Sequence, residues 1–185
     1  MTPTTHHSRL DLTSAPDAVP EVRHRARDLL RSWGVAGDVL FDALVIVTEL
    51  ATNAVLHAAG SRPRDEQEQE QRSGPNTDCV VDLRVRDDRL YMAVCDRSRQ
   101  VPVLQSPSDE TENSRGLHVV ASLTGGAWGF VYTACPPGKL VWACLLLPPS
   151  GVESLAGVGD ENAGLRQTRN PLPLAPSDGF AEVGA

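Results

Sequence analysis

The spacing of the apolar residues changes between residues 59 and 79, and that change restricts the fold more than any single motif. Between Gly37 and Ala59, apolar residues recur at helical intervals and form one stripe: Leu40, Ala43, Leu44, Val47, Leu50, Ala51, Ala54 and Ala58. From Cys79 to Cys95 they alternate with polar residues instead, which is the spacing of a half-buried strand. The two patterns together indicate an α+β protein.

The rest of the chain supplies elements of the same two kinds. A tight turn at Asp87-Asp88 joins two of the expected strands. Antiparallel hairpins on one side and helices on the other predict a two-layer α+β sandwich, in which helices cover one face of a mixed or antiparallel sheet. We expect strands over 9–13, 79–86, 89–95, 127–133 and 139–147, and helices over 14–34, 37–59 and 115–123.

Two segments contain too few large apolar residues to offset the entropy of ordering the chain. Residues 60–77 are rich in Gln, Glu and Arg and are expected to form a disordered insertion. Residues 148–185 are rich in Gly, Pro and Ala and are expected to form a disordered tail. With a flexible N-terminus over residues 1–8, the folded domain spans residues 9–147.

The charge of the chain argues against binding to nucleic acids or anionic membranes. Acidic residues outnumber basic ones by 24 to 17, for a net charge of −7, and the one lysine, Lys139, belongs to no basic run. No stretch approaches the roughly 18 apolar residues of a membrane-spanning helix, and no apolar signal segment begins the chain. The four cysteines form no CxxC pair and fit buried thiols in a reducing compartment. We therefore expect a cytoplasmic protein.

A row of polar side chains borders the apolar stripe of residues 37–59. Glu49, Asn53 and His57 are spaced four residues apart, so they lie on one face of the expected helix. An amide oxygen can bind Mg²⁺, and a carboxylate can accept a proton from an attacking hydroxyl. The row therefore suits phosphate chemistry, although an exposed polar helix face fits the same pattern.

Two further candidate binding positions lie at the end of an expected strand and at the start of an expected helix. Asp96 follows a strand and precedes an open loop, where its carboxylate can accept a hydrogen bond from a ligand amino group or simply begin a turn. Asn113 or Ser114 can cap the helix that starts near Gly116, and free N–H groups at a helix start bind anions. Arg115 adds a cation there, although a capped helix with a surface arginine fits as well.

Taken together, these clusters are more specific than any one of them. The segments TELATNAVLHA (48–58), RGLHVVASLTGGAWGF (115–130) and GKLVWACLLLP (138–148) appear in this order. The combination resembles the GHKL (Bergerat-fold) ATP-binding domain, and most nearly the small, stand-alone anti-sigma-factor serine kinases of bacteria. The resemblance covers about residues 9–148.

The resemblance implies a role for each matching residue. Glu49 matches the general base that helps to deprotonate a protein serine as it attacks the γ-phosphate of ATP. Asn53 matches the residue that holds Mg²⁺, and His57 matches a position of the same motif near the nucleotide. Asp96 matches the carboxylate that accepts a hydrogen bond from the adenine amino group.

The glycine boxes and the lid of this family can also be placed. Ser98 lies in the first glycine box, and residues 100–114 match the ATP lid. The second box, whose backbone N–H groups would meet phosphate, consists of Arg115, Gly116 and Leu117.

The sequence departs from the family pattern at three places. Ser98 and Gln100 stand where the first box often has glycines, and Ser114 stands where many relatives have another. Leu140 stands where a threonine is usual, and that threonine would join the hydrogen bonds around adenine.

The resemblance implies an ATP- and Mg²⁺-dependent protein serine/threonine kinase that regulates transcription. Its substrate would be an anti-anti-sigma protein of the STAS type, a sigma factor would be a second partner, and relatives often form homodimers. The alternative is a partner-switch module that binds ATP but transfers phosphate weakly or not at all. The retained Glu49 favours the kinase, and the altered glycine boxes favour the alternative.

Overall fold

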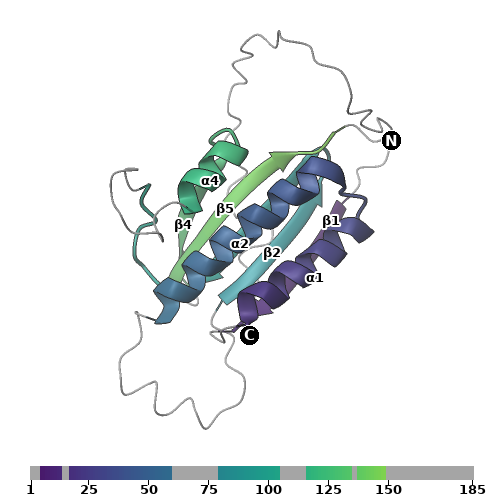
Figure 1. The fold of residues 1–185 in the computed structure, drawn as a ribbon. Coiled ribbons are helices and arrows are strands. Elements are labelled where there is room, and N and C mark those ends of the chain that lie inside the picture. The colour runs from purple at the N-terminus through teal and green to yellow at the C-terminus, as the bar shows by residue number, and fades with distance from the viewer. Residues whose placement is uncertain (1–4, 14–16, 60–78, 105–115, 135–136, 149–185) are drawn as a thin grey trace. The chain divides into compact units, whose positions relative to one another are not determined.

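The computed structural model describes residues 5–13, 17–59, 79–104, 116–134 and 137–148, all of which belong to the first of two units that divide after Ser150 (Figure 1). The expected insertion at 60–77 and, apart from Pro148, the expected tail lie outside these residues. The described elements are β1 Thr5–Leu12, α1 Ala18–Ser32, α2 Gly37–Ala59, β2 Cys79–Arg86, β3 Arg89–Asp96, α4 Gly116–Leu123, β4 Trp128–Ala134 and β5 Pro137–Leu146.

The five strands form one antiparallel sheet in the order β1-β2-β3-β5-β4. Helices α1 and α2 lie side by side on one face of this sheet, and α4 packs against α2 (Figure 1). The order of elements and the two-layer α+β fold are those predicted from the sequence. The sequence left a mixed or an antiparallel sheet possible, and the strand pairing shows that the sheet is antiparallel.

The core lies between α2 and the strands, because α2 turns its apolar stripe toward them. Alternate residues of β2, β3 and β5 face the helix, and the pairs Val81–Val94 and Val94–Val141 are neighbours across the sheet. The buried side chains of α2 are Leu40, Ala43, Leu44, Ile46, Val47, Leu50, Ala51 and Ala54. The predicted stripe is therefore confirmed except at Ala58, whose side chain lies outside the description.

The hairpin between β2 and β3 turns where the sequence predicts. Asp87 has a φ of 57°, the left-handed conformation that a short polar side chain tolerates better than most. That conformation suits a two-residue turn between twisted strands. Arg86 consequently pairs with Arg89, and every inward-facing residue of the two strands stays in register.

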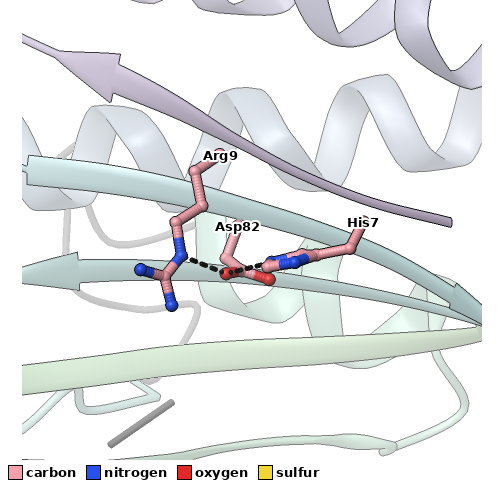
Figure 2. Close-up of polar contacts among 3 residues, drawn as sticks. All are labelled: His7, Arg9 and Asp82. Carbon is pink, nitrogen blue, oxygen red and sulfur yellow. Dashed lines mark hydrogen bonds and ion pairs between the residues drawn. The ribbon is translucent and has the colours of Figure 1, made fainter. Parts of the chain in front are cut away.

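Strand β1 begins at Thr5 rather than at Arg9, so the expectation of a flexible N-terminus fails for residues 5–8. The reason is a polar cluster on the face of the sheet away from the helices (Figure 2). Arg9 Nε donates to Asp82 Oδ2 at 3.1 Å, and His7 Nε2 donates to the same oxygen at 2.9 Å. Because Asp82 is buried, these bonds compensate part of its desolvation and hold the early part of β1.

Helix α2 is more apolar than we expected from the sequence. By length and mean hydropathy, 1.8 over Gly37–His57, it could cross a membrane, so the expectation that no stretch reaches this level was wrong. Its buried side chains line the core of the two-layer fold. Packing in a protein core accounts for the hydropathy of this helix.

The three described cysteines, Cys79, Cys95 and Cys144, are free thiols and are buried or half-buried. Burial raises the pKa of Cys95 and of Cys144. Both therefore favour the protonated thiol, which is a poor nucleophile and a poor metal ligand.

Candidate functional site

The polar row of α2 lies beside the core, as its spacing predicts. Glu49 and Asn53 are half-buried and His57 is exposed, whereas Leu50 and Ala54 on the neighbouring face are buried. A helix that must bury one side fixes the direction of the polar side chains next to it. The core therefore positions this row.

Helix α4 begins against the same row. A Cβ atom added to Gly116 would collide with Glu49 Oε2, and it would lie 3.4 Å from Glu49 Cδ and 3.6 Å from Asn53 Nδ2. Glycine leaves room for this approach, so the start of α4 lies against a carboxylate and an amide. We call this cluster of Glu49, Asn53 and Gly116 the helix end of the site.

A cavity of about 390 Å³ opens beside Asn53 and extends to the end of β3. That volume lies within the range of small-molecule sites. Polar side chains gather in its wall, and the rest of the lining is largely aliphatic. The lining residues are Leu50, Asn53, Ala54, Leu56, His57, Val94, Asp96, Gln100, Val101, Pro102, Val103, Leu117, Lys139 and Val141.

Asp96 is the acidic group of this cavity. It is only 4% exposed, and its Oδ1 accepts hydrogen bonds from Ser98 N at 2.7 Å and from Lys139 Nζ at 2.9 Å. Burial raises the pKa of the Asp96 carboxyl, and the bond from Lys139 opposes part of that rise. We call the cluster of Asp96, Ser98 and Lys139 the strand end of the site.

The segment that replaces the first glycine box folds through side-chain bonds. Ser98 N donates to Asp96, and Gln100 N donates to Ser98 Oγ at 3.1 Å, so two successive turns are closed by side chains. Arg99 lies over the ring of Tyr132 at 5.3 Å from its centroid. Among the described non-glycine residues only Asp87 has a positive φ. Ser98 and Gln100 therefore need no glycine conformation.

Lys139 lies opposite Asp96. This corrects the sequence-based expectation that Leu140 takes the place of the threonine near adenine. In the register of β3 and β5, Asp96 pairs with Lys139 and Cys95 pairs with Leu140. Because side chains alternate across a strand, Leu140 points to the face away from the cavity. Gly138 allows the strands to approach here, since a Cβ on it would collide with the backbone oxygen of Asp96.

Residues 12–144 match the family described as the histidine kinase-like ATPase domain. The chain belongs to this family. No curated protein matches the sequence significantly.

Two solved structures share the fold of this histidine kinase-like ATPase domain. One contains the RsbU and RsbW domains of Rv1364c from Mycobacterium tuberculosis, with a TM-score of 0.54 and 18% identity over 77% of this chain and 32% of that one. The other is the SiaB–SiaC complex from Pseudomonas aeruginosa, with a TM-score of 0.50 and 10% identity over 75% of this chain and 88% of that one. The chain thus spans about a third of the RsbU–RsbW chain in that structure, and at these identities the likeness establishes the fold alone.

The site residues expected of this ATPase domain fall into three groups. Asn53, His57, Asp96 and Leu117 line the cavity. Glu49 and Gly116 meet beside Asn53, and Ser98 is buried next to the cavity residue Asp96, to which its N–H donates. Arg115 lies outside the described residues.

The sequence reading missed Lys139 as part of the site. The sequence did contain a sign of this role. Lys139 is the one lysine of the chain, and it interrupts an apolar strand directly after a glycine. The reading also missed the apolar rim of the cavity, where Leu56, Val101 and Val103 are 47%, 48% and 60% exposed.

Proposed function

We propose that this chain binds ATP with Mg²⁺ and transfers the γ-phosphoryl group to a serine or threonine of a partner protein. The observation that carries the proposal is the contact of Gly116 with Glu49 and Asn53. It joins a helix start, a carboxylate and an amide beside one cavity. Phosphoryl transfer depends mainly on such positioning and on charge stabilisation.

The residues fit a nucleotide whose phosphates lie at the helix end. Asn53 has an amide oxygen for Mg²⁺, and the free N–H groups at the start of α4, with Arg115 before them, suit anionic oxygens. His57 and Leu117 line the intervening wall. ATP would supply the phosphoryl group, and Mg²⁺ would neutralise phosphate charge.

Asp96 and Ser98 suit the adenine at the strand end. The Ser98 N–H holds one oxygen of the carboxylate, which fixes the direction of the other. That second oxygen would accept a hydrogen bond from the adenine amino group. Residues 100–114 would form the lid; the cavity wall already includes Gln100, Val101, Pro102 and Val103.

Glu49 would act as the general base. Its carboxylate accepts the proton of the serine hydroxyl while the hydroxyl oxygen forms its bond to the γ-phosphorus and the bond to the bridging oxygen breaks, so that ADP leaves. The phosphoserine and the protonated Glu49 are the products on the protein side.

The partner would be an anti-anti-sigma protein of the STAS type, with a sigma factor as the second target and transcription as the process regulated. Two structural neighbours support a partner-binding role, since one contains an RsbW domain and the other is the complex of SiaB with SiaC. We further propose a cytoplasmic homodimer without direct contact to nucleic acid or membrane, in line with the net charge of −7.

Calorimetric titration with ATP and Mg²⁺ tests the nucleotide site. We expect micromolar binding by the full chain and weakening of roughly tenfold or more in Asn53→Ala, because the magnesium ligand is lost. Thr52→Ala is the matched control, since Thr52 lies next along α2 outside the cavity lining. Without Mg²⁺ the difference between the two variants should shrink.

Phosphotransfer from γ-labelled ATP to each STAS-type protein of the same genome tests the kinase. Label on one of these proteins, removed by its serine-to-alanine change, is the expected result. ATP binding without transfer to any of them would leave the non-catalytic ATP-binding partner switch, and absence of ATP binding would overturn both functions.

A further inference from the structure

Lys139 and Asp96 form a buried ion pair in the wall of the cavity. The Lys139 and Asp96 side chains are 3% and 2% exposed, and Nζ lies 2.9 Å from Oδ1. Both residues also line the cavity. A ligand in this space therefore meets an ammonium and a carboxylate side by side.

The pair has hydrogen-bonding capacity left for such a ligand. An ammonium has three N–H donors, and among the described residues Lys139 Nζ donates to Asp96 alone. Both hydrogen bonds that Asp96 accepts within the described part of the chain go to Oδ1. The site thus offers donors from Lys139 next to an acceptor, Oδ2 of Asp96.

Stability alone is a weak reason for an ion pair at this place. Desolvating two charges costs about as much as their attraction returns, and apolar residues of similar volume are often at least as stable. The next inward-facing residues of β5, Val141 and Ala143, are apolar. A lysine as the first inward-facing residue of β5 is therefore better explained by binding to a ligand than by stability.

We propose that Lys139 is a second base-reading residue, which donates a hydrogen bond to ring nitrogen N1 of adenine while Asp96 accepts one from the adjacent amino group. The inference rests on the proposed ATP site and extends it. Adenine presents a donor and an acceptor next to each other on this edge, and the Asp96–Lys139 pair presents the complementary acceptor and donor.

The test compares ATP with 1-deaza-ATP, in which N1 is replaced by a C–H group. Wild-type protein is expected to bind 1-deaza-ATP roughly 10- to 100-fold more weakly, as for a hydrogen bond from a charged donor. In Lys139→Met, which keeps a side chain of similar length without its N–H donors, this ratio is expected to fall close to one. The control ligand 7-deaza-ATP, altered on the opposite edge, should bind wild-type protein and variant in the same ratio as ATP.

The ratio of the two affinities distinguishes recognition of the base from a purely structural role of Lys139. A structural role would weaken the binding of ATP and of 1-deaza-ATP equally. Equal binding of ATP and 1-deaza-ATP by the wild type, or a preference that persists in Lys139→Met, overturns the inference and leaves the ATP site standing. Wild-type protein that binds none of these nucleotides overturns the proposed ATP site and the inference with it.

A second measurement needs no variant that might alter folding. Because the sequence contains one lysine, ¹⁵N-lysine labelling gives a single side-chain ammonium signal. ATP is expected to shift this signal clearly more than 1-deaza-ATP does at saturation. Equal shifts would count against a bond to N1.

Discussion

The helix end of the site is built on one helix and one close approach, whereas the strand end is assembled from separate segments. Glu49 and Asn53 project from the same face of α2, and Gly116 comes up to them. Asp96 and Lys139 come from two paired strands. The helix end consists of a carboxylate, an amide and a glycine, and the strand end consists of an ion pair and a serine turn. The two ends can therefore be varied independently.

The largest effect should come from Glu49→Gln at the helix end. Removing a general base typically slows proton transfer by 100- to 10,000-fold, and ATP affinity should stay within about twofold, because the amide keeps the shape of the side chain. Phosphotransfer rates and calorimetric titration measure the two quantities. Asp42→Asn, on the same helix outside the cavity lining, should change neither. A parallel loss of ATP binding would show that Glu49 serves mainly to hold α4.

At the strand end, Gly138→Ala should cost stability. The added Cβ would collide with the backbone oxygen of Asp96 and lie 3.0 Å from Arg97 Cα, and overpacking of this kind costs about 1–3 kcal/mol. Urea unfolding measures the loss. Gly129→Ala is the control, because the nearest atoms to its Cβ belong to the ring of Trp142 and not to the backbone. Equal losses would mean that the approach of the strands at Gly138 is not tight.

The raised pKa of Asp96 makes binding at the strand end depend on pH. Protonation removes both the acceptor for the base and the partner of Lys139, so affinity should fall roughly tenfold per pH unit below that pKa. Adenosine is the suitable ligand, since it carries no titrating phosphate, and Asp96→Asn should lose this dependence. Wild-type affinity that is flat down to the ordinary carboxyl range would contradict the prediction.

The same pKa shift makes the stability of the fold depend on pH in the opposite direction to ligand affinity. Because burial raises the pKa of Asp96 above its value in the unfolded chain, the protonated carboxyl favours the folded state. The stability that this group contributes is present at low pH and is lost as the pH rises through the folded pKa.

The smallest effect is expected from Ser98→Ala. The hydroxyl accepts a partly buried hydrogen bond from Gln100 N, and leaving that N–H without its partner costs about 1 kcal/mol. Ser32→Ala removes an exposed hydroxyl that donates to Leu29 O at 2.7 Å and should cost less. Urea midpoints for the two variants test the difference, and equal losses would mean that the Ser98 turn does not stabilise the strand end.

The part of the helix end that lies on α2 could be predicted from the sequence, because that information is local. Spacing of four residues puts Glu49 and Asn53 on one helix face, and a glycine at the start of a predicted helix indicates where a second element can approach. The close contact at Gly116 then follows from the packing of α4 on α2. The bounds of α2 were also predicted correctly, since its stripe is long and regular.

The strand end could not be predicted in the same way, because it depends on the register between β3 and β5. Register decides which of two adjacent residues faces the cavity, and the sequence reading assigned this position to Leu140 instead of Lys139. The early start of β1 was missed for a similar reason. Its anchor, Asp82, lies far away in the sequence.

Helix α2 carries one half of the proposed site. Its apolar face is part of the core, while Glu49 and Asn53 move with any tilt of the helix and Asp96 stays with the sheet. A small loosening of the packing would change the distance between the two halves of the site before any strand separates. We therefore expect ATP binding to weaken on heating before the sheet unfolds.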